Sequence, residues 1–325
     1  MMFFAAQTST VPVAIFPSWG RGHILYTYDL RNWLQQAIFS NPVVDYVFTG
    51  AYDPSTNRVV ISTDQALGVW ATTPAGVIGY YSGRNGGNWA RMSAGLGTTN
   101  WSTCANGDIF FGTTTYVYRV APLTGVTTRY TVLSSGAVKE TVYDSVSGKY
   151  SISVGGTTYY TTDFASFTAS AVGFGTSPVV NTIFNGPAGR IVAAGNSTGN
   201  VGKVSTSDDG GVTWTNRTLP APSGGGASTM YRGTYSSDLG MYFLAGGGLT
   251  YYSYDGVTWT QGSTLGANII RGIAYSSSLK VVYVVDSALN TWTSVDGLSW
   301  QNMLVNKRRF ATAGFDTSHG MIAIR

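Results

Sequence analysis

Apolar and polar residues alternate in short runs along the whole chain, and these runs recur in pairs. Each pair consists of an apolar strand, a polar turn and a second apolar strand, as in RGIAYSSSLKVVYVV from Arg271. Alternation over about four to eight residues indicates half-buried β-strands, and a turn rich in Ser, Asp and Gly joins two of them as a hairpin. The pattern predicts a series of hairpins, which begin at Val47, Trp101, Glu140, Asn181, Arg232, Arg271 and Phe310.

A second recurrent element, which we call the turn unit, follows the hairpins. Its clearest copy is YYSYDGVTW, residues 251–259, in which a strand ends, turns on Asp255-Gly256 and leads into a new strand at Trp259. An Asp carboxylate at this position can accept hydrogen bonds from the backbone N–H groups of its own turn, and Gly supplies a positive φ that a branched residue resists. The Trp is expected to pack as an apolar plug against a neighbouring layer.

Six further segments occupy the place of a turn unit. Residues 207–214 and 294–300 are strong copies, whereas 27–33, 82–89 and 161–167 are weaker, and 118–130 keeps almost none of the residues. Arg84 replaces the acid in the segment 82–89. The acidic and aromatic positions that we assign to turn units are Asp29, Trp33, Trp89, Asp163, Phe167, Asp209, Trp214, Asp255, Trp259, Asp296 and Trp300.

The order of these elements predicts a closed ring. The chain begins with a turn unit that has no hairpin before it and ends with a hairpin that has no turn unit after it. If the last hairpin supplies two strands and residues from about Pro12 to Gln36 supply two more, one blade is shared between the termini and two open sheet edges disappear. The spacing of roughly 40 to 50 residues per repeat is typical of four-stranded propeller blades. We therefore predict an all-β, seven-bladed β-propeller as a single domain over 1–325, with a short N-terminal arm over about 1–10 and six blades as the alternative.

The turn units resemble the Asp-box, also called the bacterial neuraminidase repeat, whose pattern is S-x-D-x-G-x-T-W. Ser253, Asp255, Gly256, Thr258 and Trp259 match it, and the resemblance extends over nearly the whole chain as a repeat. It implies that the boxes lie at the outer edge of the blades, between the third and fourth strands and away from the central channel. The Asp and Trp residues of the boxes are then structural, and carboxylates spread around a rim cannot form a paired acid and base.

Composition and charge narrow the choice of partners. Only 10% of the residues are charged, 42 are Gly and 21 are Tyr, which is typical of many turns joining aromatic-rich strands. The net charge is +4, but the longest basic run is Lys307-Arg308-Arg309, so we expect no nucleic-acid partner. Cys104 is the single cysteine, which excludes an internal disulfide. We expect no membrane span, because no apolar run approaches the length of about eighteen residues that a span needs.

Other sequence features exclude further classes of chemistry. The opening segment MMFFAAQTST lacks a basic region, so we do not interpret it as a signal peptide. His23 and His319 are too few and too far apart in sequence to indicate a zinc site. The glycines match neither a P-loop nor a dinucleotide fingerprint. We expect no metal and no cofactor.

Candidate binding residues must come from the starts of the innermost strands, which line the channel mouth of a propeller. The charged residues that fall there are Lys139, Glu140, Arg232, Arg271, Arg308 and Arg309. Sialidases with this repeat use three arginines to clamp a carboxylate, a Tyr–Glu nucleophile pair and an acid Asp, and the arginines here are similar. The chain departs from that pattern, since Glu140 is its only glutamate, no family-like arginine motif lies near the N-terminus and no inner-strand Asp is an obvious acid.

The chain resembles structural proteins of tailed bacteriophages in its low charge, its high content of Gly, Ser, Thr and Tyr, and its degenerate boxes. This resemblance implies a non-enzymatic virion protein, a tail-associated propeller present in multiple copies, that docks to other virion proteins or to a host cell-surface glycan. It would be assembled in the host cytoplasm. The alternatives are a sialidase-like glycoside hydrolase and a cellular lectin or scaffold propeller.

Overall fold

The computed structural model describes residues 14–17, 23–37, 47–63, 69–72, 90–93, 96, 99, 101–132, 136–222, 229–288, 290–303 and 322–323. Of the residues singled out from the sequence, those outside these ranges are Arg84, Trp89, Lys307, Arg308, Arg309, Phe310 and His319. The predicted turn unit 82–89 and the arm over 1–10 also lie outside them. Trp33 lies in a described strand, but its side chain is outside the description. The structural statements below concern the described residues.

Nearly all of the regular structure in these ranges is β. Two single-turn 3₁₀ helices occur, η2 (Pro187–Gly189) and η3 (Thr198–Asn200). The strands are β1 (Ala14–Pro17), β2 (His23–Thr27), β3 (Trp33–Ala37), β4 (Val47–Asp53), β5 (Arg58–Thr63), β6 (Val69–Thr72), β7 (Ala90–Ser93), β8 (Trp101–Ala105), β9 (Asp108–Gly112), β10 (Tyr116–Val120), β11 (Thr127–Thr131), β12 (Val138–Asp144), β13 (Lys149–Val154), β14 (Thr157–Thr161), β15 (Thr168–Ser170), β16 (Val179–Asn185), β17 (Ile191–Ser197), β18 (Val201–Ser207), β19 (Thr215–Arg217), β20 (Met230–Ser236), β21 (Met241–Ser253), β22 (Thr260–Ser276), β23 (Val281–Asp286), β24 (Thr291–Ser294), β25 (Gln301–Asn302) and β26 (Ile322–Ala323).

These strands form five four-stranded sheets and one six-stranded sheet. The six-stranded sheet divides into two, because β21 and β22 are each long enough to serve as two strands. β21 pairs with β20 through residues 241–246 and with β22 through residues 247–252, and it changes direction at Gly248, whose φ is 79°. β22 leaves β21 at Ile269 and pairs with β23 from Ile270 onward. The result fits the seven predicted blades of four antiparallel strands.

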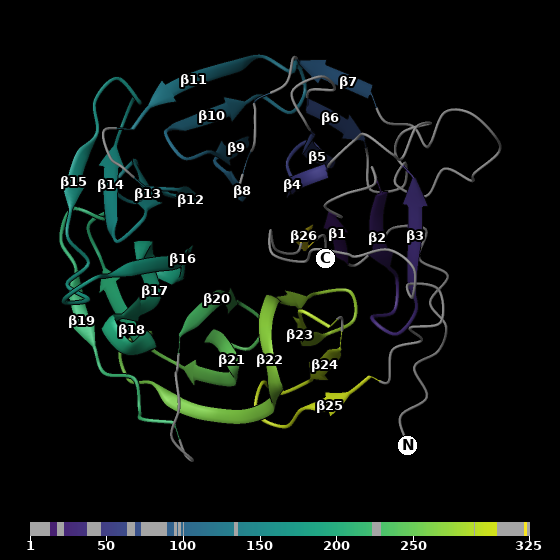
Figure 1. Ribbon diagram of the computed structural model, residues 1–325, viewed down its shortest axis with the longest axis vertical. Coiled ribbons are helices and arrows are strands. Elements are labelled where there is room, and N and C mark those ends of the chain that lie inside the picture. The colour runs from purple at the N-terminus through teal and green to yellow at the C-terminus, as the bar shows by residue number, and fades with distance from the viewer. Residues whose placement is uncertain are drawn as a thin grey trace.

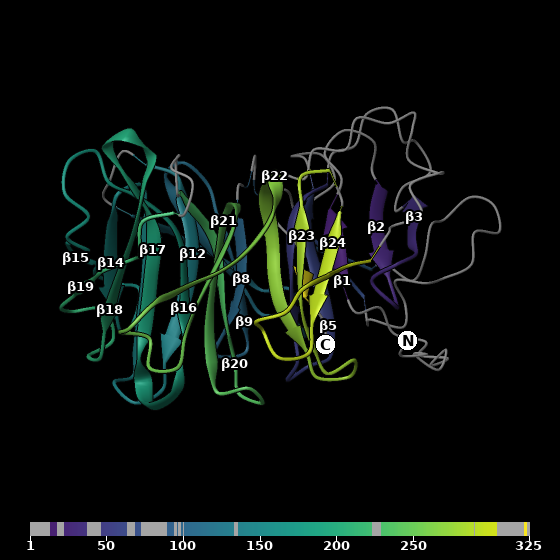
Figure 2. The same cartoon turned by 90° about the horizontal axis from the view of Figure 1, so that it is seen from below.

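We number the blades in chain order. Blade 1 contains β26 and β1–β3, blade 2 β4–β7, blade 3 β8–β11, blade 4 β12–β15, blade 5 β16–β19, blade 6 β20, β21 and the first part of β22, and blade 7 the rest of β22 and β23–β25. Figure 1 shows the blades arranged in a ring, with β8, β12, β16 and β20 toward its centre and β11, β15 and β19 at its outer edge. Seen from the side in Figure 2, the strands run across the thickness of the ring.

The ring is closed by strands from the two ends of the chain, as predicted. β26 pairs antiparallel with β1 through Ala14 with Ala323 and Ile15 with Ile322. The predicted division of this blade, two strands from each end, was wrong for the N-terminal segment, which supplies three strands, β1 to β3. The sequence SWGRG between Pro17 and His23 contains two glycines, which favour a turn, and β1 and β2 pair as antiparallel strands where a single strand was expected.

The hydrophobic core lies largely between neighbouring blades. Between blades 3 and 4, Phe110 on β9 packs against Tyr150 on β13 and against Phe164 in the turn between β14 and β15, with ring centroids 5.7 and 5.4 Å away. Between blades 5 and 6, Val192 and Ala194 of β17 lie in one cluster with Tyr242 and Trp259. Burial of large aromatic surfaces between sheets is a dominant favourable contribution to folding.

The clearest turn unit has the hydrogen bonds expected from its sequence. The Ser253 hydroxyl donates to Asp255 Oδ1 at 2.9 Å, and the same oxygen accepts the N–H groups of Val257 and Thr258 at 2.8 and 2.7 Å. Gly256 has a φ of 71°, and Trp259 Nε1 donates to the Gly256 carbonyl at 3.1 Å. The unit connects β21 to β22, at the third-to-fourth strand connection of blade 6.

The other strong copies repeat these contacts. Asp209 accepts the hydroxyl of Ser207 and the N–H of Val212, and Asp296 accepts the hydroxyl of Ser294 together with two backbone N–H groups. Both units also connect third and fourth strands, β18 to β19 and β24 to β25. Trp214, Trp300 and Phe167 are half-buried, whereas only 4% of Trp259 is exposed. Each of these carboxylates is used by its own turn.

Two of the weaker copies keep the turn without its glycine. Leu30, which follows Asp29, has a φ of 61°, and Phe164, which follows Asp163, has a φ of 62°. A side chain in this region is strained, but both residues are deeply buried, with 1% and 3% of their surface exposed. Their packing into the core therefore offsets the strain that Gly avoids in the strong copies.

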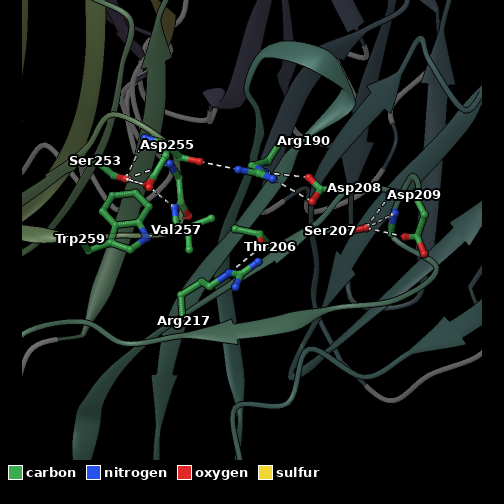
Figure 3. A network of polar contacts seen from close by, with 12 residues as sticks. Arg190, Thr206, Ser207, Asp208, Asp209, Arg217, Ser253, Asp255, Val257 and Trp259 are labelled. Atoms are coloured by element: carbon green, nitrogen blue, oxygen red, sulfur yellow. Dashed lines mark hydrogen bonds and ion pairs between the residues drawn. The ribbon is translucent and has the colours of Figure 1, made fainter.

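Turn units of adjacent blades are also linked to each other. Arg190, which directly precedes β17 in blade 5, forms a bidentate ion pair with Asp208, with Nε to Oδ1 at 2.7 Å and Nη2 to Oδ2 at 2.9 Å. Its Nη1 donates to the carbonyl of Asp255 in blade 6. Figure 3 shows Arg190 between the two turns. A bidentate guanidinium contact fixes geometry as well as charge, so Arg190 ties the two blades together at their turns.

The Asp255 contacts lead to a prediction about acid stability. Burial by itself raises the pKa of Asp255, but the hydrogen bonds from the backbone of Thr258 and Val257 and from the Ser253 hydroxyl outweigh it and hold the pKa at about 2, below the ordinary 3.8. A lowered folded-state pKa adds stability that is present above pH 4 and is lost as the pH falls through 2. Asp255→Ala should lower the free energy of unfolding by about 1–2 kcal/mol at pH 7, measured by denaturant titration.

The pH dependence separates this effect from a general loss of packing. The difference between wild type and Asp255→Ala should shrink between pH 4 and pH 2, because the wild-type carboxylate becomes protonated there. Asp255→Asn, which keeps one acceptor oxygen, should lie between the two proteins at pH 7. A difference that stays constant down to pH 2 would contradict the role of the carboxylate charge.

Candidate functional site at the centre of the ring

The innermost strands of several blades begin with a β-bulge. The register shifts between Val138 and Thr141 in β12, between Val180 and Thr182 in β16, and between Ile270 and Gly272 in β22. A bulge adds a residue that has no partner in the ladder and turns its side chain to a new direction. The shifted segments contain Lys139 and Glu140, Asn181, and Arg271.

Side chains from these strand starts meet across the centre of the ring. The guanidinium carbon of Arg232, on β20 of blade 6, lies 4.0 Å from the centroid of the Trp101 ring, on β8 of blade 3. Lys139 Nζ, on β12 of blade 4, lies 5.9 Å from the same ring. Blades 4 and 5 separate β8 from β20, and Figure 1 shows the two strands facing each other from different sides of the ring. The cation–π contact therefore spans the centre.

A chain of hydrogen bonds links four consecutive blades at the same level. Lys139 Nζ donates to Asn181 Oδ1 at 2.7 Å, and Asn181 Nδ2 donates to the carbonyl of Met230 at 2.9 Å. Arg232 Nε then donates to the carbonyl of Arg271 at 3.0 Å. These contacts run from blade 4 through blades 5 and 6 to blade 7. We call Trp101, Lys139, Glu140, Asn181, Arg232 and Arg271 the central cluster.

Glu140 is held by the backbone and not by a cation. Its Oε2 accepts the N–H of Ile183 at 2.6 Å, and its own N–H donates to the Ser153 hydroxyl at 3.0 Å. None of the ion pairs between described residues includes Glu140. Burial raises its pKa, while the charges of Arg232 and Lys139 and the Ile183 hydrogen bond lower it, and the net shift is upward. The two charged groups that act on Glu140 are both cations.

The cations of the cluster are poorly hydrated and repel one another. Burial lowers the pKa of Lys139 to about 8, and the positive charge of Arg232 lowers it as well. The negative charge of Glu140 raises this pKa, but by less. Burial also lowers the pKa of Arg232 to about 10, with Glu140 opposing and Arg271 adding to the shift. Only 8% of Arg232 is exposed. Arg271 Nε is buried without a hydrogen-bond partner.

The structure thus brings together four of the six residues singled out from the sequence: Lys139, Glu140, Arg232 and Arg271. That they bind a ligand remains a prediction, and Arg308 and Arg309 lie outside the described residues. Sequence reasoning missed Trp101 and Asn181 as members of the site. Both stand at the start of a predicted hairpin, the position that Glu140 and Arg232 occupy in their own repeats, so this register could have identified them.

The described residues contain no group of three or more His, Cys, Asp or Glu side chains placed to hold a metal ion. Likewise, the helices found in this part of the chain include none with the length and apolar character needed to cross a membrane. Cys104 has its pKa raised to about 12, by burial first and then by the charge of Asp53 and the hydrogen bond to it, which makes it a poor nucleophile.

Solved structures that resemble the chain are β-propellers and propeller-containing proteins. The WD40 β-propeller domain of Doa1 aligns with a TM-score of 0.64 and 12% identity over 90% of this chain and 93% of that one. YCF48 bound to the D1 peptide aligns with a TM-score of 0.55 and 14% identity over 92% of this chain and 89% of that one. The GH74 enzyme of Niastella koreensis aligns with a TM-score of 0.55 and 15% identity over 86% of this chain. The alignment covers only 42% of the enzyme's length.

The four-stranded antiparallel sheets and these structural relatives define the chain as a β-propeller. No protein-family model matches it, and no curated protein matches it in sequence. At identities of 12 to 15% the structural likeness describes the fold alone.

Proposed function

We propose that the chain is a non-enzymatic binding propeller, a tail-associated structural protein in the virion of a tailed bacteriophage. In this role the ring acts as a rigid platform that docks to other virion proteins and contacts a host cell-surface glycan. Many copies on one particle would supply avidity that a single weak site lacks. The low content of charged residues and the Ser-, Thr-, Gly- and Tyr-rich texture support the phage setting, through the resemblance described above.

The environment of Glu140 is the main support for the proposal that the chain is not an enzyme. Glycoside hydrolases of the common type use two carboxyl groups on either side of the scissile bond. The charged groups that act on Glu140 are Lys139 and Arg232, and its carboxylate is bound by the backbone of Ile183. The box carboxylates Asp209, Asp255 and Asp296 accept hydrogen bonds within their own turns, between third and fourth strands. A basic cluster with one anchored carboxylate suits binding better than acid–base catalysis.

One observation favours a second candidate, a glycoside hydrolase. Burial raises the pKa of Glu140, as it does for the general acid of many such enzymes. Under this alternative Glu140 would donate a proton to the leaving group, and a second carboxylate would have to act as its partner.

A paired binding and turnover assay distinguishes the two candidates. Purified protein is applied to a glycan array and to host cells, and in parallel to fluorogenic sialosides and neutral glycosides. We expect binding without turnover, and we expect Arg271→Gln to weaken the binding by about tenfold, as for a lost charged hydrogen bond. Arg129→Gln, on the outer strand β11, is the matched control and should bind like wild type.

Hydrolysis that disappears in Glu140→Gln would overturn the non-enzymatic proposal and establish the glycosidase. Binding that survives Arg271→Gln unchanged would place the binding surface elsewhere on the ring. Binding to neither glycans nor cells would leave docking to other virion proteins as the role to test, by reconstitution with particle proteins.

A further inference from the structure

The central cluster has more hydrogen-bond donors than acceptors. Lys139 carries three N–H donors and Arg232 and Arg271 carry five each. Lys139 donates to Asn181, and Arg232 donates to the carbonyls of Tyr231 and Arg271. Arg271 Nε is buried with no acceptor at all. A buried charged donor without a partner is costly, and an anion that accepts from it would remove that cost.

The cluster also has more positive than negative charge. The cluster contains three cations, Lys139, Arg232 and Arg271, and one carboxylate, Glu140, which leaves a formal surplus of two positive charges. The cations interact, since Arg271 lowers the pKa of Arg232 and Arg232 lowers that of Lys139. The carboxylate of Glu140 does not relieve this repulsion by direct pairing, because its Oε2 is bound to the Ile183 N–H.

The donors are held in place before any ligand arrives. Arg232 is stacked on Trp101 and bonded to two carbonyls, and Lys139 is bonded to Asn181. The inner strands that carry them are fixed by pairing with β13, β21 and β23. A preorganised set of donors binds an anion with less loss of side-chain entropy than flexible surface residues do.

We propose that the central cluster binds a tetrahedral oxyanion, the phosphate or sulfate monoester group of a larger ligand, through Lys139, Arg232 and Arg271. A phosphate monoester carries close to two negative charges at pH 7, which matches the surplus of the cluster, and a sulfate monoester carries one. The three free oxygens of either group point in different directions and can accept from donors on β12, β20 and β22 together, whereas a carboxylate offers two oxygens in one plane. This inference rests on the proposed binding function and names the chemical group that would be recognised.

The test is calorimetric titration of the folded protein with sodium sulfate, sodium phosphate and sodium acetate at pH 7 and constant ionic strength. Sulfate or phosphate should bind with one-to-one stoichiometry and at least about tenfold more tightly than acetate. Arg271→Gln should weaken oxyanion binding by about tenfold or more. This substitution leaves the Arg271 carbonyl, which Arg232 uses, in place. Arg129→Gln, outside the cluster, should bind as wild type does.

A pH series supplies an independent readout. Sulfate remains doubly charged throughout, so a fall in its affinity between pH 7 and pH 9 would report the loss of the proton from Lys139, whose pKa is about 8. The other charged groups of the cluster are Glu140, Arg232 and Arg271, and Arg232, with a pKa of about 10, keeps most of its charge at pH 9. Lys139→Met should bind sulfate more weakly at pH 7 and lose the pH dependence.

Comparison of sulfated with phosphorylated sugars then identifies the source of the group. Equal affinities of wild type and Arg271→Gln for sulfate and phosphate, or acetate binding as tightly as both, would overturn the oxyanion site. That result would leave the proposed function intact if cell or glycan binding were still observed. Conversely, oxyanion binding without any binding to cells, glycans or virion proteins would contradict the proposed function and preserve the site.

Discussion

Phe110→Ala should lower the free energy of unfolding by about 3–5 kcal/mol, the cost of truncating a buried aromatic side chain that leaves a cavity. Phe110 is 2% exposed and joins two blades, since it lies on β9 of blade 3 and stacks on Phe164 of blade 4 at an interplanar angle of 14°. The cavity would open between sheets that are each held by their own hydrogen bonds, so it should collapse only partly. Equilibrium unfolding in urea measures the loss.

Two further variants test whether the loss comes from the interface between blades. Phe110→Leu, which keeps most of the volume, should cost about 1–1.5 kcal/mol. Leu123→Ala removes apolar volume from a residue that is 63% exposed and should change stability by less than about 0.5 kcal/mol. A loss below about 1 kcal/mol for Phe110→Ala would mean that blades 3 and 4 pack less closely than described.

Arg232→Met should lower stability by about 3 kcal/mol at pH 7, because it removes a buried charge that its surroundings need. The substitution deprives the carbonyls of Tyr231 and Arg271 of their donor and leaves Glu140 with Lys139 as the remaining cation that lowers its pKa. The measurement is the free energy of unfolding in denaturant at two pH values.

The pH dependence follows from the sign of the Glu140 shift. Its folded-state pKa is raised, so folding is favoured below the unfolded value of 4.5 and the contribution is lost as the pH rises through the folded value. Without Arg232 the pKa should rise further, so the penalty of Arg232→Met should be smaller at pH 4 than at pH 7.

The double variant Glu140→Gln/Arg232→Met should recover part of the loss at pH 7 and lack this pH dependence. Arg129→Met, whose guanidinium lies over Tyr116 on the outer strands, is the control and should change stability by less than about 0.5 kcal/mol. An equal penalty for Arg232→Met at both pH values would show that packing and hydrogen bonds, not charge, account for it.

Much of the architecture could be predicted from local patterns. Hairpins and turn units have strong residue preferences, since Asp255 and Gly256 fit one turn geometry, and their order along the chain indicated that the termini share a blade. The positive φ of Leu30 and Phe164 could not be predicted in this way, because burial in the core overrides the local preference for Gly. The hairpin formed by β1 and β2 was missed because its strands are short and carry little alternation.

The candidate site could be predicted only in part, because it depends on contacts between distant repeats. The starts of inner strands indicated Lys139, Glu140, Arg232 and Arg271, since charge is rare in this chain and stands out there. Trp101 carries no charge, and its sequence context predicts a packing residue. It contacts Arg232 of another blade only because the strands are arranged in a ring. Asn181 is likewise uncharged, and the sequence alone does not show that it accepts a hydrogen bond from Lys139.

The bulges at the starts of the inner strands have a consequence for how such a ring changes over evolutionary time. Glu140, Asn181 and Arg232 occupy the same position in three successive repeats, yet one is an acid, one an amide and one a base. Their identities are set neither by the strand ladder nor by the apolar layers, which hold Val142, Ile183 and Leu244 in the adjacent core. Selection can therefore change what the centre of the ring recognises one blade at a time while the strand ladder and the apolar layers stay the same, at the cost of contacts such as those of Arg232.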